Sequence, residues 1–598
     1  MTEPKRRIPT TGAPPGKDPH CPILSAVSLP QRFRPNATNW YWWLDCFSPP
    51  AMGIPGLARR SEPYAECRST QQLQGYQAIV DGPSLAYHAH KLALAGSPRV
   101  PSYADINAEA IRWLSTLEAA NIKVSKIVFD GALPTSKRNE RVHRLEQNNS
   151  RVRNYRVQYP AASCPVPTYL GSILHAFLAP SLREALLNTP FASRTRIEPG
   201  EADDWCALHA KDYARSIIFT SDTDLLLYSY SAETVVVFFQ DADISAGFKS
   251  YCPEQMRKRL QLDSLAQFAF AITQEPSHTS EELLRDARNL DLAFETFLEF
   301  SGRYAGRTDS PSYLTKEGGL PLPLQNLDVR ISEFVHQALN KSPTPLVYLP
   351  LLVEDPNQSS AWSIGEDFRR LAYSILAPKT SIVHEYRRKA QGISTHELPL
   401  QTLDFSTSDM LAHICGVSKW AADRKLPPQM MWPLFALSIV LLDSKATPSI
   451  PVVLHMLNGD FDNSWEFIHL TARLQAVLYS LRMLQQVTTI HHAIHGTSSA
   501  VADNLPYQIA KHLASLPSIA DTFTVPGQSR KLLAEHDRLK NMVEEIYIAS
   551  GVEIPTEHVS GKKKKKQSRE AERKKKKQEQ RQQAKPNISN PYSMLEGQ

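Results

Sequence analysis

The chain has 598 residues, 42% hydrophobic and 21% charged, a composition typical of globular proteins with room for two or more domains. Its seven cysteines include no CxxC pair, which argues against a zinc ribbon and a disulfide scaffold and fits a reducing compartment. The net charge of +6 misleads, because residues 561–598 carry thirteen basic and four acidic residues, which leaves the first 560 residues at −3.

Four regions are expected along the chain. Residues 1–51 are rich in proline and polar residues and have no helical or strand period, so they are expected to be mostly disordered. Residues 52–275 alternate strand and helix signals, as expected of an α/β domain. Residues 276–555 have mostly helical spacing of apolar residues, and the lysine-rich residues 556–598 form a disordered tail.

The apolar stretch at residues 430–442 is too short to span a bilayer. We therefore expect it to be a buried helix, and we expect no membrane partner.

Three short apolar segments share one design, because each stops at an aspartate. They are YQAIVDG at 76–82, KIVFDG at 126–131 and SIIFTSDTD at 216–224. The pattern predicts buried parallel strands with carboxylates at their C-terminal ends, the edge of an open α/β sheet where ligands bind.

The acidic residues at strand ends and helix starts form the candidate metal site. They are Asp81, Asp130, Glu201, Asp203, Asp222, Asp224 and Glu275. Such carboxylates would repel one another unless hard, oxygen-seeking cations lay between them. For a single aspartate, a helix cap or turn is the better interpretation, but the ordered set favours metal binding.

The segment PGEADDW, residues 199–205, decides how Glu201 and Asp203 can act together. Two positions apart on a regular helix they would diverge, whereas Asp204 would share the face of Glu201. Pro199 and Gly200 predict that the helix starts here, which lets Asp203 reach the site and leaves Asp204 as an alternative ligand.

These motifs occur in an order that resembles a known family. MGIPGL at 52–57, the DG pairs at Asp81 and Asp130, GEAD at Glu201 and TSDTD at Asp222 are similar to flap-endonuclease-like (XPG-type) nucleases. DGALPTSKRNERVHRL at 130–145 and the segment 345–376 resemble the Asteroid branch of that family. The resemblance covers roughly residues 52–377. It implies a PIN-like, 5′–3′ exonuclease-type parallel-sheet domain followed by a mostly helical Asteroid-type region. Because MGI begins the chain in that family, the resemblance also implies that residues 1–51 are either a wrongly assigned start or a real addition.

The resemblance also implies roles for the site residues. The first four acids would face one Mg²⁺ or Mn²⁺ ion, and Asp222, Asp224 and a seventh acid would face a second. Lys137 and Arg144 would grip the scissile phosphate, and Arg138 and Arg141 would add nucleic-acid contacts. Two departures stand out: Glu275 is a longer substitute followed by proline, and residues 277–286 lack the glycines of a duplex-binding hairpin.

The function expected from the sequence is a divalent-metal-dependent, structure-specific nuclease that acts as a monomer on DNA or RNA. The alternative is a catalytically weak or inactive nucleic-acid-binding or scaffold protein on the same fold. The lysine-rich tail favours a nuclear location, and otherwise the cytoplasm.

Overall fold

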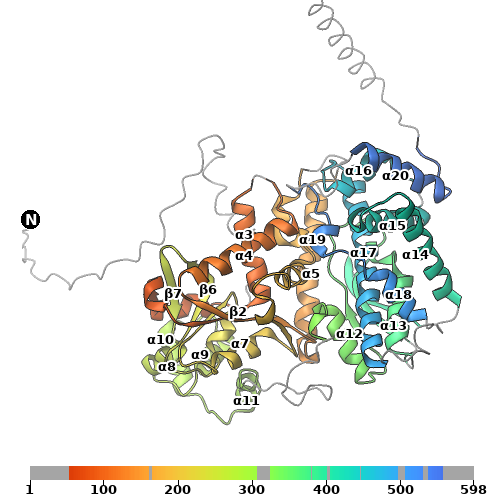
Figure 1. Ribbon diagram of the computed structural model, residues 1–598. Coiled ribbons are helices and arrows are strands. Elements are labelled where there is room, and N and C mark those ends of the chain that lie inside the picture. Colours follow the sequence, from red (N-terminus) through yellow and green to blue (C-terminus); the bar gives the residue numbers. More distant parts are fainter. Residues whose placement is uncertain are drawn as a thin grey trace, which may run out of the picture.

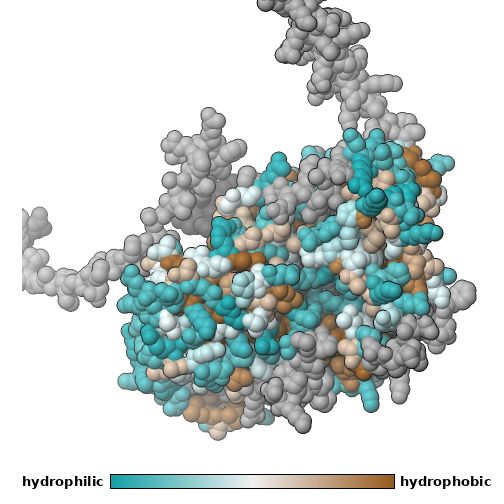
Figure 2. Space-filling model, viewed as in Figure 1, coloured by the Kyte–Doolittle hydropathy of each residue, from teal (hydrophilic) through white to brown (hydrophobic). Residues whose placement is uncertain are grey.

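The computed structural model describes residues 53–97, 99–160, 165–305, 324–378, 380, 382–400, 405–444, 446–495, 505–528 and 536–555 (Figure 1). The predictions for residues 1–51 and for the lysine-rich tail lie outside these residues. In the part of the chain described, no helix combines the length and the apolar character needed to cross a membrane. The face seen in Figure 2 is mainly hydrophilic, with small apolar patches.

A seven-stranded sheet lies at the centre of the first half, in the order β1-β7-β6-β5-β2-β3-β4. From β6 to β4 all neighbours are parallel, and β7 and β1 add an antiparallel edge. The strands are Glu66–Arg68 (β1), Gln77–Asp81 (β2), Lys123–Asp130 (β3), Thr195–Glu198 (β4), Ser216–Thr220 (β5), Thr234–Asp243 (β6) and Gly247–Tyr251 (β7). The three predicted apolar segments are therefore neighbouring parallel strands, β3, β2 and β5.

Helices cover both faces of this sheet (Figure 1). One face carries α3 (Gly82–Ala95), α4 (Tyr103–Ala119) and α6 (Leu178–Leu186), and the other carries α7 (Ala202–Ala210), α8 (Pro253–Leu260) and α9 (Leu265–Gln274). Side chains alternate along each strand, so Val80 packs in one core cluster and Ile79 in the other. The same alternation places Asp81 and Asp130 on the α7 side.

Further helices complete this half. They are α2 (Leu57–Ser61), α5 (Arg138–Gln158), α10 (Ser280–Arg288) and α11 (Glu295–Gly302), with short 3₁₀ turns that include η3 (Thr135–Lys137), η4 (Thr168–Leu174) and η6 (Thr223–Leu226). The 21-residue helix α5 lies between the sheet domain and the C-terminal helices (Figure 1). It packs against the strand β10 of the C-terminal half.

The C-terminal half is mainly helical, as expected. Its helices are α12 (Val329–Leu339), α13 (Glu366–Leu376), α14 (Phe405–Asp423), α15 (Pro428–Leu442), α16 (Ile450–Asn458), α17 (Trp465–His495), α18 (Leu505–Leu513), α19 (Ile519–Thr522) and α20 (His536–Ala549). The apolar stretch at 430–442 lies within the buried helix α15.

The expectation of a mostly helical region did not include the three-stranded sheet that this half contains. It has the order β10-β9-β8, from Gly392–Pro399 (β10), Ile382–Lys389 (β9) and Leu346–Tyr348 (β8). Strand β9 buries charged side chains, which hides its strand pattern. Arg369 of α13 and Glu385 of β9 are both fully buried and lie 2.6 Å apart. Tyr373 donates a hydrogen bond of 2.9 Å to the same carboxylate.

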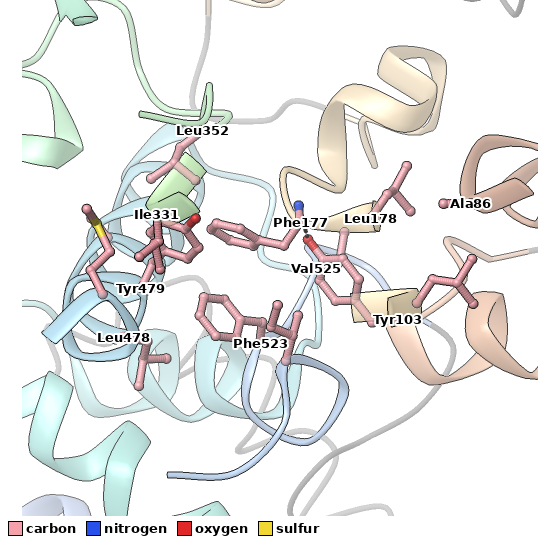
Figure 3. Packing of buried hydrophobic residues seen from close by; sticks show 14 of the residues in the cluster. Ala86, Tyr103, Phe177, Leu178, Ile331, Leu352, Leu478, Tyr479, Phe523 and Val525 are labelled. Atoms are coloured by element: carbon pink, nitrogen blue, oxygen red, sulfur yellow. Dashed lines mark hydrogen bonds between the residues drawn. The ribbon is translucent and has the colours of Figure 1, made fainter. Parts of the chain in front are cut away.

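The two halves share one hydrophobic core. Phe177, just before α6, stacks on Tyr479 of α17 at a centroid distance of 4.7 Å and makes an edge contact with Phe523 at 4.7 Å (Figure 3). The backbone N–H of Phe177 donates to the hydroxyl of Tyr103 on α4 at 3.2 Å. Residues of the sheet, of α3 and of α17 belong to a single buried cluster. The C-terminal helices therefore contribute to the core of the sheet domain.

Candidate active site

The site is built at the point where the sheet changes direction. The chain passes from β2 to β3 on one side and later returns to β5 on the other. A crevice at the carboxyl ends of the strands is expected at such a switch point. Asp81 ends β2 and Asp130 ends β3, so both carboxylates come to this crevice.

The other predicted acids come from two helix starts beside these strand ends. Glu201 is the N-cap of α7, so the helix begins where Pro199 and Gly200 predicted, and Asp203 lies in its first turn. Asp222 caps the 3₁₀ turn η6, which contains Asp224.

The first six predicted acids line one cleft of 2720 Å³. Burial raises the pKa of Asp203, and so do the negative charges of four other acids, which therefore lie close to it: Asp222, Asp81, Glu201 and Asp130.

Asp81 is held by two hydroxyl side chains that the sequence analysis missed. Ser84 donates to it from its backbone N–H at 3.1 Å and from its hydroxyl at 2.5 Å, and the Thr220 hydroxyl donates at 2.8 Å. Both hydroxyl residues are fully buried. The DGPS sequence, an N-cap aspartate followed by proline in the first turn, is the signal that could have indicated Ser84.

The carboxylates strongly perturb one another. Burial, and then the charges of Asp81 and Glu201, raise the pKa of Asp130 to about 7. Burial and the charge of Asp224 raise the pKa of Asp222 to about 7, and burial with the charge of Asp222 raises the pKa of Asp203 well above its usual value. Ionising all of these carboxylates at once costs free energy, because they are buried and repel one another, and a bound cation would offset that repulsion.

The donor set fits hard divalent cations in its chemistry, because every candidate ligand is an oxygen. As they stand, however, no three histidine, cysteine, aspartate or glutamate side chains of the described residues converge closely enough to hold a metal ion. The carboxylates instead accept hydrogen bonds: Asp130 accepts one from the N–H of Ala202 at 2.8 Å, and Asp222 accepts one from the N–H of Asp224 at 2.9 Å. A bound cation would therefore have to replace some of these bonds.

Two residues distant in sequence close the site around Asp224. Its carboxylate accepts hydrogen bonds from the N–H of Ile54 at 2.9 Å and from the hydroxyl of Tyr304 at 3.0 Å. Gly53 is so near that a Cβ atom on it would lie 2.2 Å from the Thr223 hydroxyl. No local pattern indicates Tyr304, because it follows Asp224 by 80 residues.

Lys137 and Arg144 reach the acids from the start of α5 and its second turn. The Lys137 ammonium lies 3.0 Å from Glu201 and 3.4 Å from Glu140. Burial would lower the pKa of Lys137, but the two carboxylates outweigh it and raise it. Arg144 pairs with Glu140, and its positive charge offsets a small part of the rise in the pKa of Asp222 that burial and Asp224 cause. Both cations line the cleft.

Arg138 and Arg141 both contact the C-terminal half, and Arg141 also lines the cleft. The Nε of Arg138 donates to the Tyr386 hydroxyl on β9 at 2.9 Å. Arg141 pairs with the buried Glu333 of α12, and its guanidinium lies 4.4 Å from the centre of the Tyr348 ring. Both side chains therefore fasten α5 to the small sheet and α12, and their contact with nucleic acid stays a prediction.

Glu275 lies apart from the other six acids. It is the C-cap residue of α9, its side chain is 58% exposed, and it is not among the residues that line the cleft. Its role as a seventh ligand stays a prediction. The alternative ligand Asp204 does line the cleft, and it accepts a 2.8 Å hydrogen bond from the Tyr228 hydroxyl.

Comparison with protein families finds a match for the middle of the chain. Residues 174–400 match the family described as "XPG domain containing". The match supports an XPG-type family. The XPG-type region is less than half of the chain, contains Glu201, Asp203, Asp222 and Asp224, and ends after β10. It thus includes both the second part of the acidic site and the small sheet.

A solved structure gives a more distant similarity. The structure titled "human GEN1 in complex with Holliday junction DNA in the upper interface" matches with 16% sequence identity and a TM-score of 0.27. The match covers 42% of this chain and 59% of the GEN1 chain. A TM-score this low carries no argument about the present chain. The search of curated proteins finds no significant sequence match to the present chain.

Proposed function

We propose that the protein is a divalent-metal-dependent, structure-specific nuclease that hydrolyses phosphodiester bonds of DNA or RNA, of the Asteroid type within the XPG-type nucleases. The observation that carries the proposal is that six carboxylates line one cleft at the sheet edge together with Lys137, the N-cap residue of α5, and Arg144 of α5. Carboxylates attract hard cations, and the two basic residues supply charge that a phosphate can bind.

The residues have separable roles in this proposal. Asp81, Asp130, Glu201 and Asp203 would hold one Mg²⁺ or Mn²⁺ ion, and Asp222 and Asp224 a second. The two ions would supply an activated water and would offset charge on the leaving oxygen.

Lys137 and Arg144 would orient the scissile phosphate and stabilise the charge that develops on it. Ser84 and Thr220 fix the Asp81 carboxylate, and Tyr304 fixes that of Asp224.

The test compares the wild-type protein with Asp222→Asn. Labelled single-stranded, flapped and duplex DNA and RNA are incubated with each protein in Mn²⁺ and in EDTA. We expect products only with the wild type and only in Mn²⁺, because the amide keeps the N-cap hydrogen bond but loses the charge. Asp212→Asn, an exposed carboxylate outside the cleft, is the matched control and should cleave normally. Equal, metal-independent cleavage by all three proteins would contradict the proposal.

A second function, binding of nucleic acid without cleavage, is favoured by two observations. Glu275 lies outside the cleft, and the described carboxylates do not converge on a preformed metal site. Retention of substrate by the wild type in a mobility-shift assay, with no product in Mn²⁺, would select this function. A nuclear location remains part of the proposal, from the lysine-rich tail beyond the described residues.

A further inference from the structure

Two arginines, one of them buried and the other partly buried, line the cleft away from the predicted acidic site. Arg183 lies on α6, and Arg330 lies in the first turn of α12. Both line the cleft that contains the carboxylates. Neither was predicted as a site residue, because isolated arginines on amphipathic helices carry no motif.

These guanidinium groups are incompletely paired. The Nε of Arg183 and the Nη1 of Arg330 are buried and have no hydrogen-bond partner among the described residues. Asp328 is the carboxylate that acts on both arginines, and it lies 3.9 Å from Arg330. Burial lowers the pKa of Arg183 to about 10. Two cations that share the carboxylate of Asp328 leave a local positive charge, and at the buried Arg183 this charge is costly unless another anion is present.

The surroundings also suit an anion. Helix α6 begins at Leu178 without a capping side chain, and its first residues line the cleft. The N-terminus of a helix favours negative charge through its free N–H groups and its dipole. On the facing helix α3, Lys91 is exposed to the cleft and forms no ion pair with a described residue. Tyr87, one turn before Lys91, lies near enough to Arg330 to contribute to the rise in the pKa of that arginine.

We propose that this part of the cleft is a phosphate subsite, in which Arg183, Arg330 and Lys91 receive a phosphate of the bound nucleic-acid strand. The proposal rests on the function proposed above and extends it from the scissile bond to a second phosphate of the same strand. The phosphate is either internal or terminal, since the guanidinium and ammonium groups bind both.

The experiment measures binding of full-length Arg330→Met and Lys91→Met to fluorescent single-stranded oligonucleotides in EDTA, where metal-dependent cleavage is prevented. Each oligonucleotide is used with a 5′-phosphate and with a 5′-hydroxyl. We expect each variant to bind about tenfold more weakly than the wild type, and the slope of log K against log salt to fall by about 0.7 for each lost phosphate contact. Arg215→Met is the matched control, because Arg215 is exposed and lies outside the cleft.

The two forms of oligonucleotide distinguish the source of the phosphate. Weaker binding of the 5′-phosphate form alone indicates a terminal phosphate, and equal weakening of both forms indicates an internal one. Circular dichroism and thermal unfolding check the fold of each variant. If Arg330→Met does not fold, the exposed Lys91→Met still decides the question.

The subsite is overturned if both variants bind like the wild type with an unchanged salt slope, or if Arg215→Met weakens binding as much as they do. It is also overturned if the wild type binds no oligonucleotide. Cleavage in Mn²⁺ is recorded separately. A wild type that cleaves while the variants bind normally keeps the nuclease and removes the subsite. A wild type that binds without cleaving while the variants bind weakly keeps the subsite and removes the nuclease.

Discussion

The repulsion among the carboxylates makes a measurable prediction for Asp130→Asn. The amide can still accept the hydrogen bond from the N–H of Ala202, but it carries no charge. The substitution therefore removes the electrostatic cost at this position while it preserves the packing. In the metal-free protein we expect the variant to be more stable than the wild type at neutral and alkaline pH.

The magnitude follows from the pKa of Asp130, which is about 7 in the folded protein against an ordinary value of 3.8. The folded state holds the proton more tightly, so this carboxyl stabilises the fold at low pH. That stability is lost as the pH rises from 4 towards 7. At about 1.4 kcal/mol per pKa unit, the loss amounts to about 4 kcal/mol above pH 7 and is small at pH 4.

Thermal unfolding in EDTA at a series of pH values measures the effect. We expect the melting temperature of Asp130→Asn to exceed that of the wild type by several degrees at pH 8, with a difference that shrinks towards pH 4. Mn²⁺ should then stabilise the wild type more than the variant, because the cation needs the charge. Asp212→Asn, exposed and outside the cleft, should show neither effect. A variant that is less stable than the wild type at pH 8 in EDTA would refute the reasoning.

Three other substitutions test separate features. We propose that Lys137 stabilises the transition state, so Lys137→Met should lower the cleavage rate in Mn²⁺ by about 10²-fold or more and weaken binding in EDTA much less. Equal losses in cleavage rate and in binding would indicate that Lys137 contributes to substrate binding instead. Gly53→Ala should lower Mn²⁺-dependent cleavage, because its Cβ would lie 2.5 Å from the Asp222 carboxylate. Gly75→Ala should not, because Gly75 also has a positive φ but has no atom within 4 Å of the added Cβ. Equal activity of the two variants would contradict the idea that close packing of Gly53 on Asp222 matters for cleavage. Arg369→Met should destabilise the protein by about 3–5 kcal/mol in chemical denaturation, because the fully buried Glu385 loses its ion-pair partner at 2.6 Å and keeps only the Tyr373 hydroxyl and Arg387 at 4.0 Å. The more exposed Arg370→Met should cost about 1 kcal/mol or less. Similar denaturation midpoints for both variants would contradict this reasoning.

Local sequence signals predicted the parallel strands and the carboxylates at their ends. The apolar runs before Asp81, Asp130 and Asp222 indicated buried strands because strands covered on both faces need continuous hydrophobic residues. The proline–glycine pair before Glu201 indicated the start of α7, because proline restricts φ and glycine permits the positive φ that Gly200 adopts just before the helix. Short-range pattern was sufficient for these features.

The features that were missed depend on distant contacts or on buried charge. Strand β9 buries Glu385, Arg387 and Arg388 through ion pairs, so its sequence lacks the alternation of apolar and polar residues that marks a strand. Tyr304 reaches Asp224 only through the tertiary fold. The basic residues at the start of α5 look alike in sequence, yet Lys137, its N-cap residue, pairs with Glu201 while Arg141 pairs with Glu333.

The shared hydrophobic core has a practical consequence for experiments on fragments. A piece of the chain that stops near residue 275, or at residue 400 where the XPG-type region ends, would lack α17 and the segment around Phe523. Phe177 would then lose both aromatic partners, and the parts of α4 and α6 that pack against α19 would be exposed to water. We expect such fragments to aggregate even though every proposed catalytic residue is present in them. Failure of an isolated catalytic fragment would therefore report on folding and say nothing about chemistry.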